Sequence, residues 1–263
     1  MSNSQSFSEF KAEIDKKINS HPAIANNEYT AWFAKGEQSQ KDVEDFIIQY
    51  SLFSNDLNFA LFQKMINAKS RKQMRQTKEL LMNELGVIYK PQGKAEYNPD
   101  DVENLGTVDG GRFRFSAGHY EWLADTGEAV GLRYDQFGQT AQGNKNSQEF
   151  SKIMIDLYKS NNSDSEGANY ALEHWASSGF WLELIEGFRK FEKKVSKKIP
   201  IGFFTYHYKI EAQHKVHTED ALREIFDEPN FSQKHFSEGA IKVLDALHHF
   251  WVGLYAPIIA KKA

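Results

Sequence analysis

The sequence contains no cysteine, which excludes disulfide bonds, thiolate metal sites and a cysteine nucleophile. It also lacks an excess of positive charge: the formal net charge is −4, so nothing in the charge indicates a nucleic-acid partner. The first residues, MSNSQSFSEFKAEIDKK, lack the apolar core of a secretory signal, and no apolar run reaches the roughly 18 residues of a membrane span. We therefore expect a soluble cytoplasmic protein with no membrane or nucleic-acid partner.

Apolar and aromatic residues are plentiful. Hydrophobic residues make up 40% of the 263 positions and aromatic residues 14%, with 20 phenylalanines. This composition is sufficient for a substantial core. In the absence of cysteine, a metal ion would have to be held by histidine and carboxylate, a donor set that suits iron, manganese or zinc.

The apolar residues recur mostly at helical spacing. Ser39 is typical of a helix N-cap, and Gly86 is typical of the residue that follows a helix. These patterns predict an all-α fold, a bundle of seven or eight helices in a single domain over 1–263. The predicted helical segments are 7–18, 29–34, 39–68, 70–86, 116–130, 147–160, 165–194, 201–226 and 236–255.

The stretch 87–115 has no helical period. It is rich in Gly, Pro, Asp and Asn, and only RFRF at 112–115 alternates as a short strand would. A connection of this length in a compact domain is often a lid or a binding element. We interpret it as an insertion between two helices, and no convincing strand pairing is predicted.

The segment FFTYHYKIEAQHKVHTED, residues 203–220, carries the clearest chemical pattern. His207, Glu211 and His214 are spaced i, i+4 and i+7, which places them on one stripe of a helix. Two imidazoles on either side of a carboxylate are typical of a helix that donates metal ligands, although an exposed polar face would give the same spacing. His217, one turn further on, fits a surface position better than a ligand position.

Other predicted helices offer donors on apolar faces. Glu173 lies in a run of apolar residues, where an unpaired carboxylate is costly, whereas its neighbour His174 points about 100° away and fits a core or surface histidine. His119 is followed by Trp122 and Leu123, and Glu121 is expected to face solvent. Glu84 opposes the dipole at the end of its helix, so it is either an exposed end residue or a partner of a cation.

In order and spacing, these segments resemble the heme-oxygenase-like diiron oxidases. This superfamily includes the chlamydial protein associating with death domains and the undecene-forming fatty acid decarboxylase. The matching segments are NELG at 83–86, GHYEWL at 118–123, ALEHWASSGFW at 171–181 and HYKIEAQH at 207–214. The resemblance covers about residues 40–255. It implies six metal ligands: Glu84, His119, Glu173, His207, Glu211 and His214.

One departure from the family pattern concerns the first two ligands. In the family they lie within two turns of one helix, whereas Glu84 and His119 are 35 positions apart with the insertion between them. Either the insertion loops out and leaves both ligands in place, or Glu84 is not a ligand and the site is smaller.

The resemblance also implies a reaction. Its members use two Fe(II) ions, with Fe/Mn as an alternative pair, and O₂ as co-substrate to oxidise a small molecule. The implied substrate bears a carboxylate and is derived from an amino acid or a fatty acid. The outcome would be N-oxygenation, C–C cleavage or oxidative decarboxylation. Whether the reaction uses an external electron donor, and whether the protein forms a homodimer, are both left open. Candidate pocket residues are Phe203, Tyr206, Tyr170 and Arg112, with Phe204, Tyr208 and Arg114 as weaker ones.

Two other functions compete with this hypothesis. One is a metal-free enzyme of the same fold, similar to the TenA-type thiaminases or the PqqC-type cofactor-synthesis oxidases. The thiaminase version would need a cysteine nucleophile, which the chain lacks. The other is a non-catalytic helical binding or scaffold protein. Metal content would separate both from the diiron hypothesis.

Overall fold

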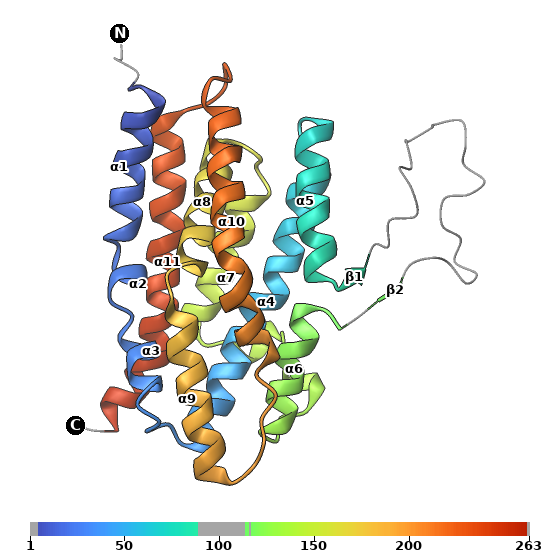
Figure 1. The fold of residues 1–263 in the computed structure, drawn as a ribbon, viewed down its shortest axis with the longest axis vertical. Coiled ribbons are helices and arrows are strands. Elements are labelled where there is room, and N and C mark those ends of the chain that lie inside the picture. Colours follow the sequence, from blue (N-terminus) through green and yellow to red (C-terminus); the bar gives the residue numbers. More distant parts are fainter. Residues whose placement is uncertain (1–4, 89–113, 116, 262–263) are drawn as a thin grey trace.

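The structure is a computed structural model that describes residues 5–88, 114–115 and 117–261; for 88, 114–115 and 210–217 it describes the backbone alone. Within these ranges the chain forms helices and two short strands (Figure 1). They are α1 (Phe7–Asn19), α2 (Pro22–Ala25), α3 (Glu28–Phe33), α4 (Gln40–Ile66), α5 (Arg71–Glu84), β1 (Val87–Ile88), β2 (Arg114–Phe115), α6 (His119–Ala129), α7 (Lys145–Tyr158), α8 (Ser163–Ala176), α9 (Phe180–Val195), α10 (Gly202–Phe226) and α11 (Gln233–Ala260).

The prediction of an all-α bundle is confirmed. Ser39 caps α4 as predicted, because its side chain accepts a hydrogen bond from the backbone N–H of Asp42. The described residues form more helices than the seven or eight predicted. Part of the difference is the short helix α2, which was not predicted, and part is the division of the predicted segment 165–194 into α8 and α9. Whether 1–263 is one domain stays a prediction.

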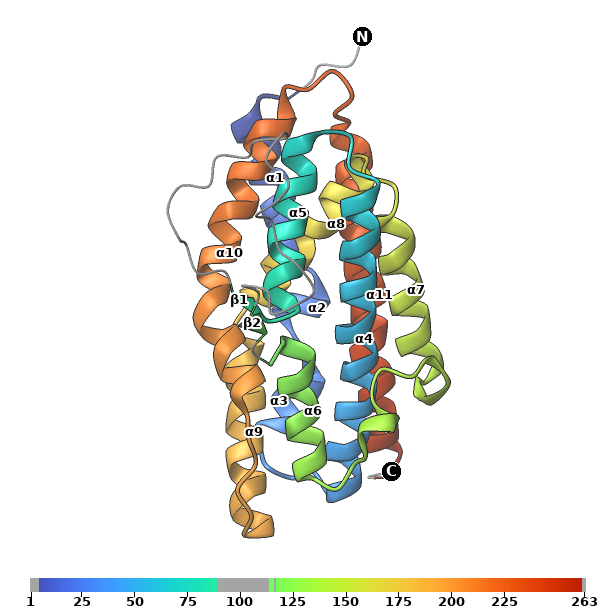
Figure 2. The same cartoon turned by 90° about the vertical axis from the view of Figure 1, so that its right-hand side faces the viewer.

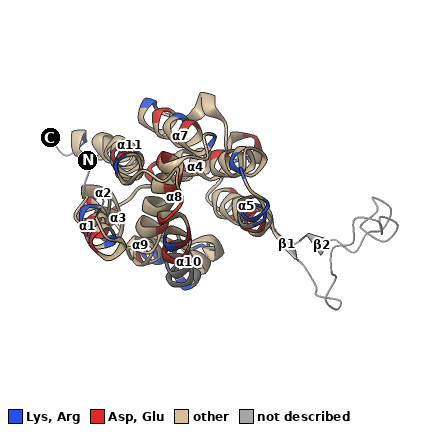
Figure 3. Ribbon diagram, turned by 90° about the horizontal axis from the view of Figure 1, so that it is seen from above, with Lys and Arg blue, Asp and Glu red and all other residues tan. Residues whose placement is uncertain are grey.

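The helices are arranged in two groups whose long axes are roughly aligned (Figures 1 and 2). In one group α4 packs on α5, α6 and α7; in the other α10 packs on α8 and α9. The helix α11 packs on both α8 and α7, so it joins the groups along one side. Seen from above, α8 lies in the middle of the bundle (Figure 3).

The close packing of α8 on α11 depends on two glycines. A Cβ atom on Gly167 would lie 1.9 Å from the carbonyl oxygen of Phe236, and one on Gly239 would lie 2.1 Å from that of Asp164. Both contacts are far too short for real atoms, so only glycine lets the two backbones approach this closely. By length and composition α11 could also span a membrane, and 44% of its most apolar 18-residue window is buried within the bundle.

Two predicted helix boundaries are wrong. The segment 165–194 is not one helix: α8 ends at Ala176 and α9 begins at Phe180, because Gly179 adopts φ +93° between them. This conformation suits glycine and breaks the helical path. The last helix also does not stop before Pro257 but continues through it to Ala260.

The two strands determine how α5 is connected to α6. Val87 pairs with Phe115 and Ile88 with Arg114 in an antiparallel ladder, contrary to the expectation of no strand pairing. This pairing closes the two ends of the predicted insertion on each other, while residues 89–113 lie outside the described residues. The end of α5 is thereby placed directly beside the start of α6.

A glycine completes this junction. Gly118 is the N-cap of α6, and a Cβ atom there would lie 2.7 Å from the carbonyl oxygen of Glu84. The absence of a side chain therefore allows the start of α6 to contact the end of α5. Gly86, at φ +70°, ends α5 in the predicted way.

Candidate metal centre

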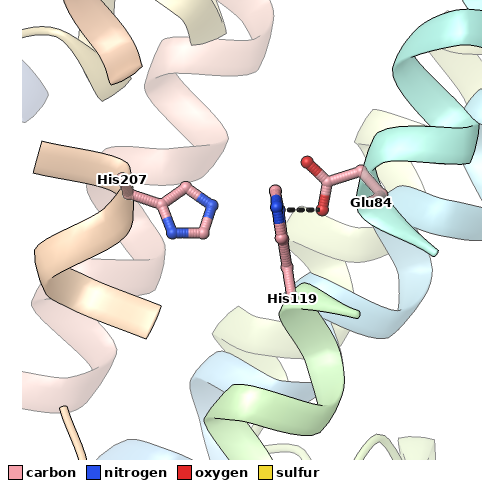
Figure 4. A group of neighbouring side chains, drawn as sticks. All are labelled: Glu84, His119 and His207. Carbon is pink, nitrogen blue, oxygen red and sulfur yellow. Dashed lines mark ion pairs between the residues drawn. The ribbon is translucent and has the colours of Figure 1, made fainter. Parts of the chain in front are cut away.

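Three predicted metal ligands meet where α5, α6 and α10 converge (Figure 4). Glu84, His119 and His207 each offer a donor atom, and these atoms lie within 4.8 Å of one another. The Nδ1 atom of His119 is 2.9 Å from Oε2 of Glu84. The 35 positions between these two residues in the sequence therefore do not separate them in space. The structure places Glu84 beside His119, and the role of Glu84 as a ligand stays a prediction.

His207 is oriented by its own helix. Its Nδ1 lies 2.7 Å from the backbone carbonyl oxygen of Phe203, and since a carbonyl can only accept, Nδ1 carries the proton. The lone pair of the neutral ring is therefore on Nε2. Metal-binding histidines usually donate their second N–H to a carbonyl or carboxylate in this way. The ring also stacks on Trp181, with centroids 4.9 Å apart and an interplanar angle of 22°.

His119 is held by aromatic contacts and by Glu84. The imidazole is only 2% exposed, and it stacks on Trp122 with ring centroids 5.3 Å apart. Tyr206 approaches it from α10 at 5.0 Å. Because Glu84 is itself only 9% exposed, its carboxylate needs a cationic or hydrogen-bonding partner, which His119 supplies when protonated.

A cavity opens beside this cluster. Its volume is about 80 Å³, below the roughly 300–1,000 Å³ of most small-molecule sites, and Glu84 and His207 form part of its wall. Apolar side chains of α4 and α8, such as Phe53 and Trp175, make up much of the rest. Among the described lining residues there is no lysine or arginine.

Glu173 lines the same cavity from α8. It is half-buried, as the apolar surroundings in the sequence suggested, and it lies near Tyr158. Burial raises the pKa of the Tyr158 phenol well above its usual value, and the carboxylate of Glu173 raises it further. Three of the predicted ligands, Glu84, Glu173 and His207, therefore line the same cavity.

The donor set is suited to a transition metal. Carboxylate oxygen and imidazole nitrogen are the ligands that iron, manganese and zinc accept, and they come here from separate helices of a bundle. The lone pair of His207 is oriented, and both histidines are buried. The residues present therefore fit a bound metal ion.

No family model matches the chain, and no curated protein matches it. Solved structures do. A domain of unknown function from Shewanella denitrificans, described as having a heme oxygenase-like fold, matches with TM-score 0.64 at 10% identity, covering 100% of this chain and 97% of that one. A CADD-like protein of unknown function from Nostoc punctiforme matches with TM-score 0.63 at 17% identity, covering 97% and 98%. A TenA homolog from Pseudomonas syringae matches with TM-score 0.64 at 10% identity, covering 95% and 92%.

This chain has the heme oxygenase-like fold. The solved structures are of the kinds that the sequence motifs resembled, CADD-like and TenA-like. At 10–18% identity they establish the fold of this chain and leave its activity to be argued from the site.

Within this heme oxygenase-like bundle, the remaining predicted ligands lie on α10. Glu211 and His214 are part of the same helix as His207, one and two turns further along, so the predicted helical spacing is confirmed. Their side chains lie outside the described residues, as does that of His217. Their roles as ligands stay predictions.

The predicted pocket residues have different outcomes. Phe203 lines the cavity, whereas Tyr206 packs on His119. Tyr208 is 46% exposed, so it is neither a pocket nor a core residue. Arg112 lies outside the described residues, and Arg114 is described only as backbone in β2. Phe204 is fully buried in the core, and Glu121 faces solvent as predicted.

Tyr170 is not among the described residues that line the cavity. Its hydroxyl instead donates a hydrogen bond to Oδ1 of Asp15, at 2.6 Å. Burial raises the pKa of this phenol, and the hydrogen bond to Asp15 raises it further. The residue belongs to a different polar cluster, on the α1 side of α8.

That second cluster was not predicted. It consists of Asp15 on α1, His174 on α8 and Glu219 on α10, whose donor atoms also lie within 4.8 Å of one another. Lys11 bridges the two carboxylates, at 2.6 Å from Asp15 and 3.2 Å from Glu219. His174 is buried, which fits the predicted core position. The spacing of Lys11 and Asp15, i and i+4 on one helix, is the sequence signal that could have indicated this pair.

Proposed function

We propose that this protein is an O₂-dependent non-haem diiron oxidase or oxygenase that acts on a small organic molecule in the cavity between α4 and α8. The observation that supports it best is the meeting of Glu84 and His119 across the insertion, beside His207 and the cavity wall. Donors this far apart in the chain are brought together only by the fold. Their residue types are those that iron binds.

The proposed ligands are Glu84, His119, Glu173, His207, Glu211 and His214. Two ferrous ions bound there, or an Fe/Mn pair, would supply the electrons for the reduction of O₂, with an external donor restoring them. The hydrogen bond from His207 to the carbonyl of Phe203 fixes the ring, so its Nε2 is presented to the site at little entropic cost.

The protein side chains also control access to the site. The rings of Trp181 and Phe203 pack against His207, and those of Trp122 and Tyr206 pack against His119. They exclude water from the reacting centre, which strengthens electrostatic interactions and prevents side reactions. The substrate carboxylate implied by the sequence resemblance belongs at this end of the cavity, near the bound cations. We place the enzyme in the cytoplasm, as a soluble protein.

Anaerobic loading of the metal-free protein with Fe(II) tests this function. We expect about two iron ions per chain and rapid consumption of O₂ when air is admitted. His207→Ala and Glu84→Gln should lose both, whereas His235→Ala, a change at an exposed histidine of α11, should lose neither. Iron binding no tighter in the parent than in His207→Ala contradicts the proposal.

The match to a TenA homolog supports a second candidate, a metal-free enzyme that uses the same cavity. Elemental analysis separates the two. A protein purified from iron- and manganese-supplemented cells that holds well below one metal ion per chain favours the metal-free enzyme.

A further inference from the structure

The outer face of α4 exposes three large apolar side chains. Phe59, Phe62 and Ile66 are 50%, 48% and 60% exposed. Their spacing, i, i+3 and i+7, places them on one stripe of the helix. Single exposed apolar residues are common on protein surfaces, whereas a continuous patch of them marks a surface that binds a partner. The stripe is therefore a candidate interaction surface.

The stripe lies on the flank of α4 that faces away from α7. On the α7 side, Phe53 packs on Phe150, with ring centroids 5.2 Å apart, and Asn67 donates to the carbonyl of Lys159. These two α4 residues lie about 120° and 80° round the helix from Phe59, in the same direction. Figure 2 shows α5 on the other side of α4, between α4 and α10. The apolar stripe is therefore on the side of α4 where α5 packs.

The helix α5 extends this surface. Lys72 pairs with Glu224 of α10, so that flank of α5 faces α10. Met74, Lys78 and Leu85 are exposed and lie about 120–160° further round α5, on the flank toward α4. Together with the stripe of α4 they form one exposed surface, which we call the α4–α5 face.

The α4–α5 face is also basic. Residues 67–78 contain no carboxylate but several cations, although the whole chain has a net charge of −4. These cations are all exposed: Lys69, Arg71, Lys72, Arg75 and Lys78. Among the residues that the structure describes, only Lys72 is paired with a carboxylate. The apolar stripe therefore borders a basic surface whose charge is largely uncompensated by described carboxylates.

This combination selects the kind of partner. A second copy of the chain docked face to face would bring its own cations against these, and like charges across an interface oppose association. A partner for this face must instead be acidic. A small contact surrounded by charge of one sign suits a transient complex, because the charge guides the partner to the site and the small contact lets it leave.

The same face leads to the candidate metal centre. Leu85, which is exposed, directly follows Glu84 in the chain. Lys78 precedes Glu84 by six residues, which corresponds to about 9 Å along the helix axis. On α4, Leu61 lines the cavity and its neighbour Phe62 belongs to the exposed stripe. A protein bound to the α4–α5 face is therefore separated from the centre by little more than these two helices.

We propose that the α4–α5 face docks an acidic one-electron carrier protein, which re-reduces the iron. This inference rests on the proposed function, in which an external donor restores the electrons that O₂ removes. In each encounter the carrier is oxidised by one electron and one ferric ion is reduced to ferrous, so two encounters restore the pair. The small, charged contact allows the carrier to leave between them.

Binding to the metal-free protein tests the docking surface. The probes are a plant-type [2Fe–2S] ferredoxin, which is an acidic carrier, and cytochrome c, which is a basic one. We expect titration calorimetry at low ionic strength to detect binding of ferredoxin alone, and about 0.5 M salt to abolish it. Arg75→Glu combined with Lys78→Glu should weaken ferredoxin binding about ten-fold. The control, Lys193→Glu combined with Lys242→Glu, makes the same change of charge at exposed positions of α9 and α11 and should weaken it less than about two-fold.

A second pair of variants tests the apolar stripe. Phe62 and Val252 are 48% and 45% exposed, so Phe62→Ser and Val252→Ser should both fold. Only Phe62→Ser should weaken ferredoxin binding, by about five-fold, because its ring lies in the proposed contact.

The proposal is overturned if ferredoxin fails to bind the parent, if cytochrome c binds as well, or if the Arg75/Lys78 variant keeps the parent's affinity. Vesicles of phosphatidylcholine and phosphatidylserine, and sedimentation of the protein alone, test the other occupants. Association of either kind that requires Phe62, without binding of ferredoxin, would assign the face to a lipid surface or to a second copy instead.

The iron-loaded protein provides a separate readout. The rate at which reduced ferredoxin is oxidised should fall about ten-fold in the Arg75/Lys78 variant. The first consumption of O₂ by protein loaded with Fe(II) needs no carrier and should be unchanged. Because ferredoxin binding is measured without metal, loss of binding overturns the docking surface alone, whereas a parent protein that takes up no iron or consumes no O₂ overturns the proposed function.

Discussion

The protein has two clusters of histidine and carboxylate, one where α5, α6 and α10 meet and one where α1, α8 and α10 meet, and they differ in what surrounds them. In both, a buried histidine has its Nδ1 against the carbonyl four residues earlier: His207 against Phe203 at 2.7 Å, and His174 against Tyr170 at 2.8 Å. Both therefore present Nε2 to nearby carboxylates. The same contact between histidine and backbone carbonyl occurs in both clusters, so this contact does not by itself identify a metal site.

The difference lies in the partners. At the second cluster, Asp15 accepts from Tyr170 and pairs with Lys11, so its charge is compensated within the protein. At the first, the described lining residues of the adjacent cavity include carboxylates but no lysine or arginine. A cluster whose two carboxylates are bridged by a lysine stabilises the fold, whereas two imidazoles and a carboxylate beside a cavity are suited to bind a metal and a substrate.

The largest expected effect separates the two clusters by metal affinity. His207→Ala should weaken iron binding by more than about 100-fold. Loss of a residue that only hydrogen-bonds a metal ligand already lowers metal affinity by up to about 100-fold, and loss of the ligand itself should lower it further. His174→Gln should leave the affinity within about two-fold, because its cluster already has Lys11 as a cation. Competition with a coloured chelator measures both affinities. Equal losses of iron affinity in the two variants would show that the two clusters do not differ as metal sites.

The second effect concerns stability. Asp15→Ala removes the acceptor of Tyr170 and the partner of Lys11, so we expect a loss of about 3 kcal/mol in the free energy of unfolding. Iron binding should be unaffected. Urea denaturation of the metal-free protein measures the change. As a control, Asp45→Ala breaks an exposed pair with Lys41 and should cost well under about 1 kcal/mol.

A third effect concerns the junction that brings Glu84 to His119. Gly118→Ala places a methyl group 2.7 Å from the carbonyl oxygen of Glu84 and should push α6 away, at a cost of about 2 kcal/mol and with weaker iron binding. Gly118 has φ −75°, so the backbone itself tolerates alanine. In the control Gly202→Ala the new methyl group meets no atom within 4 Å. If both variants bind iron like the parent, the junction does not position the site.

The smallest expected effect tests whether the second cluster has a structural role. Tyr170→Phe removes one hydroxyl from Asp15 and should cost about 1 kcal/mol of stability, with unchanged iron binding and unchanged O₂ consumption. Thermal unfolding and an oxygen electrode measure the two. A loss of O₂ consumption with normal stability would instead assign Tyr170 to the reaction.

Much of the bundle could be predicted because helices depend on local signals. Ser39 as a cap and the spacing of His207, Glu211 and His214 require only the residues near them. The break at Gly179 was missed because the apolar pattern continues through it, and a positive φ leaves no periodic trace. The continuation of α11 through Pro257 was missed because proline normally disfavours a helix interior.

The site was predictable only in part, because some of its contacts depend on residues that are distant in the sequence. The pairing of Glu84 with His119 depends on two strands of two residues each, at the ends of a stretch without period. Tyr170, one of the predicted pocket residues, precedes Glu173 by three residues. However, it lies i−4 to His174 and shares the face that meets α1, whereas Asn169, Leu172 and Ala176 face the cavity with Glu173.

Anomalous diffraction at the iron edge from crystals loaded anaerobically with Fe(II) is the most direct test of the difference between the two clusters. We predict iron within about 2.0–2.2 Å of donor atoms of Glu84, His119 and His207. We predict no iron at Asp15, His174 and Glu219, where Lys11 already bridges the two carboxylates. Iron at the second cluster, or none at the first, would contradict the account.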